Sequence, residues 1–523
     1  MDKKRKYSIE DDIYSGLTWS ASQQRVLEAV LTKQKNVFIT GSGGVGKSKC
    51  IEQIVKILRD RGQKVAVTAH TGIAAITIKG QTLWSFMHFN KEVLKKSKES
   101  IVADFLKKKY WCTSFQSYRA LIIDEISMID PVHFELIDYI LQMTRRDYRP
   151  FGGLQIILVG DFFQLPSPDD KKESIQRYVF QSDLFWTIID EMHDLQEMWR
   201  QKDPMFVSLL NRTRKGQQTE EDITLLHTRI GVKLDCESEG ISPTRLYSHN
   251  RDVDEINDIE LSKLSGDEKL YKLRYGSYNK KSTVFKTDFA ELNTMKLLQD
   301  VGACKFAPNA KLNDLIIKPT FLKIGSQVML TYNLDVSSGL VNGSRGVIIQ
   351  WGKTNEMRKK NNEDLIQCDS ESSFSTSDDT FLYPDECLPV VKFACGKTIE
   401  IPYVKYTLEK DGYESYVWKI ALKLAWATSI HKSQSLTLDS VEIDLSQCFE
   451  CGMAYVALSR VTSLNNLRIT KEFKSSTFKV DMDVIKFYET PFLIQKSLKL
   501  YDQTIQSKEI TCKNSIDNFE IIN

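Results

Sequence analysis

A glycine-rich stretch near the N-terminus constrains this chain more than any other feature. Residues 41–48 read GSGGVGKS; an apolar, β-rich run at 36–40 precedes them, and apolar residues recur at helical spacing over 50–59. Glycines let the backbone turn tightly enough for its N–H groups to converge on phosphate oxygens, and the start of the following helix adds partial positive charge. The pattern predicts a strand, a phosphate-binding loop and a helix, and hence a nucleoside triphosphate as ligand.

Individual positions of this loop have separate expected roles. We expect Lys47 to reach the β- and γ-phosphates and the Ser48 hydroxyl to bind Mg²⁺. The backbone around the phosphates is expected to come from Gly41, Ser42, Gly43, Gly44, Val45 and Gly46. An ordinary glycine-rich turn is the alternative, but a chance match somewhere in such a chain is only about a few per cent. The flanking strand and helix disfavour it further.

Composition limits the classes of partner and compartment. A chain of 523 residues should hold three or four domain-sized units, and its formal net charge of +2 means that nucleic acid would have to be held by local basic surfaces. Ten cysteines are scattered along a chain that starts without a signal-peptide pattern, which predicts reduced thiols in an intracellular, non-secreted protein. Cys448 and Cys451 have metal-like spacing, but a buried thiol pair is favoured over zinc.

Hydropathy and the N-terminus give two further expectations about location. No apolar run reaches the length of a membrane span, so we expect no membrane partner. The basic cluster Lys3–Lys6 is either a nuclear address or a solvated tail, and the acids at 10–12 argue against a mitochondrial presequence.

A second chemical element lies at the end of another expected strand. Residues 120–124 form a buried-strand pattern that ends in Asp124 and Glu125. Because the carboxyl ends of parallel strands line the ligand crevice, we expect Asp124 to hold Mg²⁺ and Glu125 to take a proton from the attacking water. A third strand, 154–159, runs into GDFFQLP at 160–166, and the alternation of strands and helices predicts one doubly wound α/β domain over about 16–185.

The remaining chain gives weaker signals. The lysine-rich stretch 90–118, which includes Tyr110 and Trp111, is about equally consistent with a solvated face and with nucleic-acid contact. Residues 260–300 are charged and show little sheet or core signal. Short β-type runs at 321–351 and 390–404 predict a small all-β module, which a polar loop at 354–380 interrupts. The pattern from 422 to 460 predicts a second α/β domain around this module.

Taken in order, these elements resemble the motifs of superfamily-1 helicases. The matching positions are Gln23, 41–48, 70–72, 124–125, 160–166, 200–201, 431–434 and 455–460. Within that superfamily, DEISMID, RPFGG and GDFFQLP between 124 and 166 closely resemble the petite-integration-frequency family of 5′-to-3′ DNA helicases in superfamily 1B, with RecD a more distant relative. The resemblance runs from about Leu17 to Leu467 and is weakest at 255–320, at 354–385 and after 475.

The resemblance implies an α/β fold of two RecA-like lobes, with a small wedge insertion in the first and an SH3-like all-β insertion in the second. The implied boundaries are a tail at 1–15, lobe 1 at 16–189 with the wedge at about 90–118, the start of lobe 2 at 190–300, the β insertion at 301–410, the rest of lobe 2 at 411–490 and a tail at 491–523.

The resemblance also implies roles in ATP hydrolysis. Gln23 is similar to the adenine reader of the family, and Lys47, Ser48, Asp124 and Glu125 are similar to its phosphate, Mg²⁺ and water-activating groups. Gln164 matches the γ-phosphate sensor, and Arg200 and Arg460 match the fingers that reach the transferring phosphate. The implied cofactors are ATP and Mg²⁺.

DNA is expected to cross the tops of both lobes. The implied contacts are Thr71, Thr82, Trp84, Phe163, Asn250, Thr428, His431 and Lys432. Trp84 stands where the family usually has histidine, and we expect it either to stack on a base or to turn inward beside Leu83 and Phe86. Ser435 replaces a glycine that usually follows Ser-Gln, which questions the local turn because serine tolerates positive φ poorly.

The sequence therefore predicts an ATP-dependent helicase that moves 5′ to 3′ on single-stranded DNA and unwinds tailed duplexes in replication, repair or recombination. The alternatives are an ATPase that binds or remodels nucleic acid without unwinding, and an RNA-preferring helicase. We expect a monomeric motor, located in the cell, in the nucleus or, for a viral protein, in the host cell. Its protein partners are not predicted.

Overall fold

A computed structural model gives the fold of the chain. It describes residues 19–497 except 90, 95, 168–175, 235–241, 249, 272–273, 280–283, 289–319, 333, 336–339, 341–342, 354–386 and 411–412. Three predictions therefore lie outside the described residues: the tail at 1–15 with its basic cluster, the polar loop at 354–380, and the part of the tail at 491–523 that follows residue 497.

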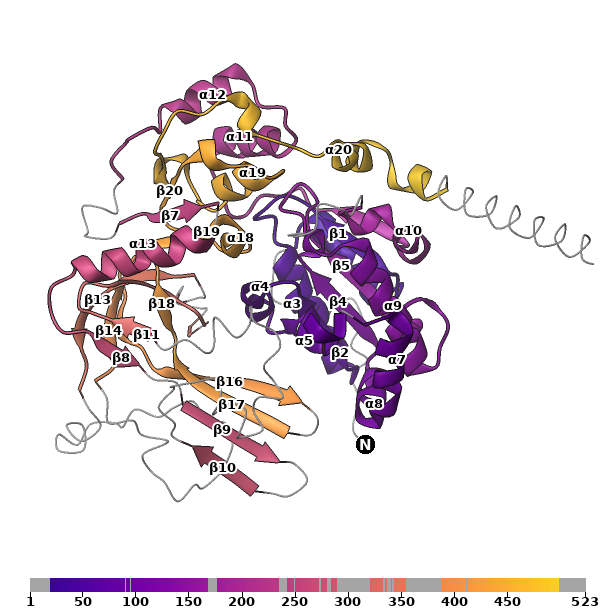
Figure 1. The fold of residues 1–523 in the computed structure, drawn as a ribbon. Coiled ribbons are helices and arrows are strands. Elements are labelled where there is room, and N and C mark those ends of the chain that lie inside the picture. The colour runs from indigo at the N-terminus through magenta and orange to yellow at the C-terminus, as the bar shows by residue number, and fades with distance from the viewer. Residues whose placement is uncertain are drawn as a thin grey trace, which may run out of the picture.

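Lobe 1 is a six-stranded parallel sheet between two layers of helices, at the right of Figure 1. Its strand order is β3-β2-β4-β5-β1-β6. The strands are β1 Val37–Thr40, β2 Val65–Ala69, β3 Gln81–Thr82, β4 Ala120–Asp124, β5 Gln155–Val159 and β6 Glu191–Asp194. The helices are α2 Ala21–Leu31, α3 Lys47–Asp60, α4 Gly72–Thr77, α5 Leu83–Phe86, α6 Lys91–Leu94, α7 Lys98–Lys107, α8 Lys109–Ser117, α9 Pro131–Arg145 and α10 Asp183–Ile188.

The strand order brings the predicted motifs of lobe 1 together. Strands β1, β2, β4 and β5 are almost wholly buried apolar runs, as expected for a parallel sheet covered on both faces. Because β5 pairs with both β4 and β1, the loops that leave their carboxyl ends are neighbours. Those loops begin at Gly41, Glu125 and Gly160.

The lysine-rich stretch folds as three helices, α6 to α8, on lobe 1. Trp111 is only 5% exposed and joins the core, so its ring offers little surface to nucleic acid. The His88 ring stacks on it at 4.2 Å between centroids, and Nζ of Lys108 lies 3.6 Å from its ring centroid. Tyr110, at 52% exposure, is accessible. The apolar residues, which recur at helical spacing, therefore decide that Trp111 faces the core, although lysines surround it in the sequence.

Lobe 2 is a smaller parallel sheet in the order β19-β7-β20-β21, at the upper left of Figure 1. Its strands are β7 Thr244–Tyr247, β19 Ala427–Ser429, β20 Val441–Ile443 and β21 Leu467–Ile469. Its helices are α11 Pro204–Arg214, α12 Glu220–His227, α13 Asn250–Lys263, α18 Ile430–Ser433 and α19 Met453–Leu458.

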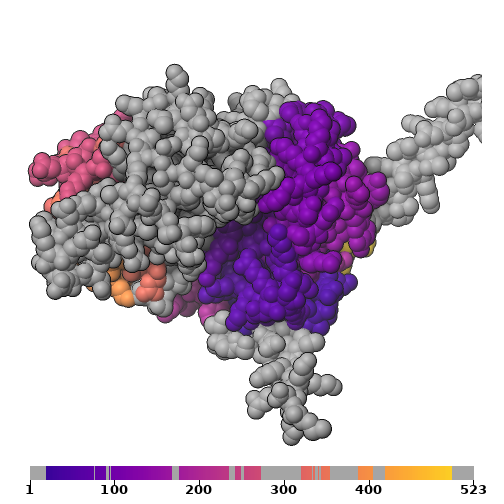
Figure 2. All heavy atoms as spheres, turned by 90° about the horizontal axis from the view of Figure 1, so that it is seen from below, coloured from indigo at the N-terminus to yellow at the C-terminus, as the bar shows by residue number. Residues whose placement is uncertain are grey.

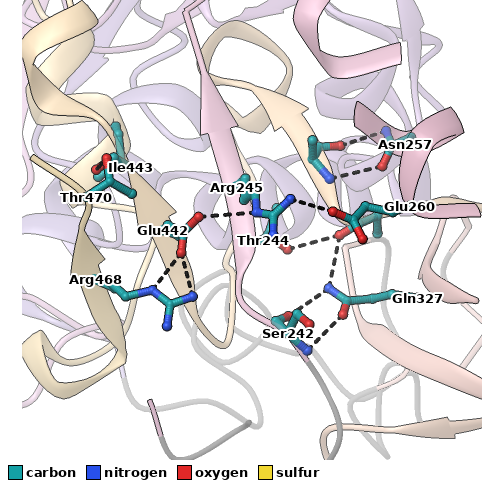
Figure 3. A network of polar contacts seen from close by, with 12 residues as sticks. Ser242, Thr244, Arg245, Asn257, Glu260, Gln327, Glu442, Ile443, Arg468 and Thr470 are labelled. Atoms are coloured by element: carbon teal, nitrogen blue, oxygen red, sulfur yellow. Dashed lines mark hydrogen bonds and ion pairs between the residues drawn. The ribbon is translucent and has the colours of Figure 1, made fainter. Parts of the chain in front are cut away.

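A polar network ties this sheet to α13 and to the β module (Figure 3). The Arg245 guanidinium bridges Glu260 of α13 at 2.9 Å and Glu442 of β20 at 3.2 Å. Asn257 exchanges two hydrogen bonds with the backbone of Ala427. Gln327, which begins strand β12 (Gln327–Leu330) of the β module, bonds the backbone of Ser242. The module is thus held on lobe 2 by paired, geometrically specific contacts.

The β module comprises antiparallel sheets below lobe 2 in Figure 1. Its strands are β8 Lys269–Tyr271, β9 Arg274–Asn279, β10 Val284–Asp288, β11 Thr320–Leu322, β12 Gln327–Leu330, β13 Arg345–Trp351, β14 Pro389–Phe393, β15 Thr398–Glu400, β16 Tyr403–Lys410, β17 Tyr413–Ile420 and β18 Leu422–Leu424. The weak sheet signal at 260–300 was misleading, because β9 and β10 form a four-stranded sheet with β17 and β16. Long-range strand pairing, invisible in local composition, organises that segment.

Two parallel α/β sheets with an inserted all-β module confirm the predicted fold class. Seen from below in Figure 2, the residues of lobe 1 form a broad surface of their own. Among the described residues, no helix combines the length and apolar character needed to cross a lipid bilayer.

The last described helices return from lobe 2 to lobe 1. Helix α20, Met482–Glu489, lies beside α10 in Figure 1. Its Val484 and Phe487 belong to the same buried cluster as Phe38 of β1 and Phe162. The chain therefore connects the two lobes twice, once before α11 and once before α20.

Candidate nucleotide and nucleic-acid site

The glycine loop closes between β1 and α3, as predicted. The Lys47 ammonium donates to the carbonyl oxygens of Gly41 at 2.7 Å and Ser42 at 3.0 Å. Burial lowers the pKa of Lys47, and the carboxylates of Asp161 and Glu125 partly offset this effect. Glycine is required at 41, where φ is +134° and a Cβ would stand 2.4 Å from the Leu195 carbonyl oxygen.

Gln23 lies against the same loop. Its side-chain oxygen accepts a hydrogen bond from the Ser20 backbone N–H at 3.1 Å, within the capping box that starts α2. Its Nε2 lies 2.7 Å from the position that a Cβ on Gly46 would take. The half-exposed Trp199 indole also borders Gly46, with its Cδ1 at 3.4 Å from that position. Sequence reasoning missed Trp199.

The two acidic residues after β4 are buried where lobe 1 meets lobe 2, and we call this junction the crevice. Burial, with the adjacent Glu125 carboxylate, raises the pKa of Asp124 to about 7. Glu125 adopts a left-handed backbone conformation, with φ +55° and ψ +47°. Its carboxylate accepts hydrogen bonds from Gln434 Nε2 at 2.8 Å and from the Ser435 hydroxyl, both of lobe 2. The expected general base is therefore held from across the interface.

Arg200 and Arg460 both border the glycine loop. A Cβ on Gly43 would lie 3.3 Å from Nη2 of Arg460 and 3.6 Å from Nη1 of Arg200. Burial, together with Arg200, lowers the pKa of Arg460. Arg460 donates to Ser459 Oγ and to the carbonyl oxygens of Val456, Ser433 and Leu436. Two cations thus face the loop, where a transferring phosphate would carry negative charge.

Gln164 lies in the loop after β5, which contacts lobe 2. Gln164 is 4% exposed and bonds Asp161. Asp161 makes a buried bidentate pair with Arg214 of α11, at 2.8 and 2.9 Å. Burial opposes the charge of Arg214, but the Asp161 carboxylate outweighs it and raises the pKa of Arg214. The sensor loop and lobe 2 are therefore joined by a charge-assisted contact.

Two tyrosines complete the crevice. The Gly43 N–H donates to the Tyr455 hydroxyl at 2.9 Å, and burial raises the pKa of Tyr455 to about 12. The Tyr488 hydroxyl of α20 bonds Thr40 Oγ1 at 2.7 Å and accepts from the Phe162 N–H at 3.2 Å. Tyr455 lies inside a motif that the sequence singled out, whereas Tyr488 follows the motifs and had no local signal.

The expected DNA contacts of lobe 1 lie near the carboxyl ends of β2 and β3. The Thr71 and Thr82 hydroxyls accept from the N–H groups of Ala74 and Ser85, so both cap helices. Trp84 is half-buried. Its ring meets His70 and His133 edge-on at 5.8 and 4.9 Å between centroids. One part of Trp84 packs on the core and another part is accessible, so stacking on a base stays a prediction.

Two members of the expected DNA set are buried. Phe163 is 5% exposed, stacks on Tyr488 at 4.7 Å between centroids and has the Arg214 guanidinium over its ring. Thr428 is 3% exposed within β19. Their side chains offer little surface to a strand in this arrangement of the lobes, and their contact with DNA stays a prediction.

The other expected contacts of lobe 2 are placed at helix starts. Lys432 is exposed and His431 half-buried on α18, where the Ser429 hydroxyl accepts from the Lys432 N–H at 3.3 Å. Asn250 begins α13, and its side chain lies outside the described part of the structure. His431 and Lys432 therefore remain candidates for contact with a nucleic-acid backbone.

The residues present fit a Mg²⁺-bound nucleoside triphosphate. The loop carries an ammonium and backbone N–H groups, with two guanidiniums against it. The buried carboxyl of Asp124, whose pKa lies near neutrality, gains a partner for its charge if a divalent cation binds there. Ser48 is exposed at the start of α3. The Cys448 and Cys451 thiols are free, and burial raises both of their pKa values.

Comparison with known proteins gives a consistent set of relatives. Residues 18–224 match the model of the PIF1-like helicases, and residues 306–351 match the 2B domain of the DNA helicase Pif1. The ATP-dependent DNA helicase PIF1 of Danio rerio is 35% identical over 478 residues, which are 90% of this chain and 63% of the relative. Protein 030L of Invertebrate iridescent virus 6 is 31% identical, with 89% and 93% covered.

Solved structures agree with these matches. The crystal structure of Pif1 helicase from Candida albicans superposes with a TM-score of 0.64 at 32% identity, covering 90% of this chain and 98% of that one. This chain spans only 63–64% of the length of the first vertebrate relatives.

Proposed function

Since this chain belongs to the PIF1-like helicase family, we propose that it is an ATP-dependent DNA helicase that translocates 5′ to 3′ on single-stranded DNA and unwinds duplexes. The family resemblance read from the sequence is thereby confirmed. The helicase activity, the direction of translocation and the DNA substrate are proposed here, and so are the domain boundaries and the roles of individual residues.

One observation carries the proposal: the charged groups expected in ATP hydrolysis converge from two lobes on one crevice. Arg200 and Arg460 adjoin Gly43, and Gln434 and Ser435 reach Glu125. Such a site is complete only when the lobes are together. Closing and opening of the crevice then couples nucleotide turnover to relative movement of the lobes, as a motor requires.

Each residue has a chemical task in this scheme. Lys47 and the loop N–H groups hold the β- and γ-phosphates, Ser48 and Asp124 hold Mg²⁺, and Gln23 reads the adenine edge. Bound Mg²⁺ neutralises charge on the transferring phosphoryl group. Glu125 accepts the proton of the attacking water, while Gln164, Arg200 and Arg460 stabilise the charge that develops on the phosphate.

The motor acts on DNA through the surface that lies at the carboxyl ends of β2 and β3 and on helix α18, which we call the edge above the crevice. Thr71, Thr82, Trp84, His431 and Lys432 are the accessible members of the expected set. Hydroxyl and cationic groups track phosphates, and a tryptophan face stacks on bases regardless of sequence. The substrates are single-stranded and tailed duplex DNA, handled by a monomer inside a cell, a nucleus or a virus-infected host.

A strand-displacement assay tests the whole proposal. Duplexes with a 5′ tail, a 3′ tail or no tail are compared, beside matching RNA duplexes. ATP-dependent displacement of the 5′-tailed DNA alone is the expected result. DNA-stimulated ATPase without displacement would identify a remodelling ATPase instead, and preference for RNA tails would identify an RNA helicase. ATPase that nucleic acid does not stimulate would contradict all three readings.

A further inference from the structure

Ser435 occupies a backbone conformation that serine seldom adopts. It follows α18 and has φ +69°, within the left-handed region that favours glycine. Such a residue persists only where its surroundings hold it, and strain of this kind often accompanies a functional constraint. The side chain of Ser435 shows what the constraint is.

The Ser435 hydroxyl donates to Oε1 of Glu125, while Nε2 of Gln434 donates to Oε2 at 2.8 Å. Both carboxylate oxygens of the expected general base therefore have a donor from the same turn of lobe 2. A carboxylate has about four acceptor positions, so two donors fix its rotamer and leave lone pairs for the proton of a water. The contact orients Glu125 without occupying it fully.

The turn that carries Ser435 is connected to the rest of the site. The carbonyl oxygens of Ser433 and Leu436, on either side of it, accept from Nη1 of Arg460 at 3.3 and 3.2 Å. Helix α18, directly before the turn, carries His431 and Lys432. If a bound strand displaces α18, the hydrogen bonds of this turn to Glu125 and to Arg460 consequently change together.

We propose that Ser435 is a positioning residue that links DNA contact at α18 to ATP hydrolysis by orienting the Glu125 carboxylate through its hydroxyl. The inference rests on the proposed function. Glycine would relieve the backbone at this position but offers no donor, and alanine would keep the strain without the donor. Serine supplies the hydroxyl at a conformational cost.

Three substitutions separate the hydroxyl from the backbone. Ser435→Gly removes both the hydroxyl and the strain, Ser435→Ala removes the hydroxyl alone, and Ser435→Thr keeps the hydroxyl with a bulkier Cβ. Thr437→Ala, an exposed hydroxyl two residues further on, is the control. ATPase is measured with and without saturating single-stranded DNA, and each variant is melted.

With DNA, kcat is expected to fall about 10-fold to 10²-fold in both Ser435→Gly and Ser435→Ala, since misplacing a catalytic group costs that much. KM for ATP should stay within about twofold, because the Ser435 hydroxyl bonds Glu125, which is expected to act on the attacking water, and not the loop that holds phosphate. The DNA-free rate should change less, so that the stimulation ratio falls. Ser435→Gly should melt above Ser435→Ala, and Ser435→Thr should retain most of the wild-type kcat.

Other outcomes overturn the inference. A wild-type kcat in Ser435→Gly would show that only the backbone matters there, and a raised KM with unchanged kcat would assign Ser435 to ATP binding. Threonine is β-branched and fits a positive φ worse than serine, so the melting temperature of Ser435→Thr is read beside its rate. If Ser435→Thr melts like the wild type yet is as slow as Ser435→Ala, the hydroxyl has no role. If DNA stimulates the wild-type ATPase but the variants are unaffected, this inference alone is contradicted. If DNA does not stimulate the wild-type ATPase, the proposed function is contradicted as well.

Discussion

The crevice between the lobes and the edge above it are built from loops of the same two sheets, yet their side chains have different surroundings. In the crevice, expected groups such as Glu125, Gln164 and Arg460 are at most 9% exposed, and each has polar partners. Along the edge, the residues expected to contact DNA differ in exposure, because Phe163 and Thr428 are buried whereas Lys432 is open to solvent.

The crevice and the edge differ because some residue types have fewer structural roles than others. A buried carboxylate or guanidinium is costly unless it is paired, so its presence in a motif points to a site. An aromatic ring or a hydroxyl at the end of a strand serves equally well in a core or as a helix cap. Phe163 and Thr82 illustrate these two uses. A buried charge in a motif therefore leaves fewer structural explanations than an aromatic ring or a hydroxyl does.

The largest expected effect concerns the crevice. Glu125→Gln should lower DNA-stimulated kcat by about 10²–10⁴-fold, because a general base contributes that much, while ATP binding is retained. Lys47→Ala should lose turnover and also bind ATP poorly, because the ammonium holds ground-state phosphates. Single-turnover hydrolysis and titration with a fluorescent ATP analogue measure the two properties. Equal loss of nucleotide affinity in both variants would contradict the division of roles.

The second prediction concerns the buried pair that joins the lobes. Arg214→Ala leaves Asp161 buried and uncompensated, so stability should fall by about 3–5 kcal/mol. Arg212 of the same helix is 39% exposed, and its partner Asp222, which is 3% exposed, keeps a hydrogen bond from the Thr219 N–H, so Arg212→Ala should cost less, about 1–3 kcal/mol. Denaturant unfolding of both variants gives the comparison. Similar losses would mean that burial does not decide the strength of these pairs.

The third prediction sharpens the comparison at the edge. Trp84→Ala should weaken binding of single-stranded DNA by about 1–3 kcal/mol if its accessible part stacks on a base. Phe163→Leu keeps an apolar side chain in a buried position and should leave DNA affinity unchanged. Fluorescence anisotropy with a labelled oligonucleotide measures both, and melting curves monitor folding. Unchanged affinity in a well-folded Trp84→Ala protein would place Trp84 with Phe163 as a packing residue.

The fourth and smallest effect is a pH dependence. In the folded chain the pKa of Asp124 is raised from 3.8 to about 7, so the folded state holds a proton that the unfolded chain releases at lower pH. Stability from this group is therefore present at acid pH and is lost as pH rises towards and through 7. Asp124→Asn cannot titrate, so its Tm advantage over wild type should grow from pH 5 to pH 8.

The melting temperatures of wild type and Asp124→Asn are measured in buffer that contains a metal chelator, and again with Mg²⁺. The cation should raise the wild-type Tm at pH 8 and narrow the gap, because it compensates the charge of Asp124. A gap that is independent of pH would show that Asp124 is ionised throughout the range.

The fold was read correctly wherever local pattern and tertiary structure agree. Buried runs such as 37–40 and 120–124 formed the expected parallel strands. The segment 274–288 did not reveal its strands. Strand β10 pairs with the neighbouring β9, but β9 in turn pairs with β17, which lies more than a hundred residues away along the chain. Similarly, Trp111 looked like a surface aromatic among lysines, but the helical spacing of its apolar neighbours carries it inward.

The sequence by itself determined the family of this protein and the chemistry that we propose for it: a phosphate loop, a pair of acids after a strand and two arginines stand in the order typical of that family, and they predict nucleotide hydrolysis. Only the tertiary structure decided which side chains meet. The Ser435 hydroxyl reaches Glu125 over 310 residues, and Tyr488 reaches Thr40 over 448. Motif residues are recognisable because their chemistry needs fixed neighbours in the chain, whereas these contacts depend on how two lobes pack, and packing leaves no local pattern.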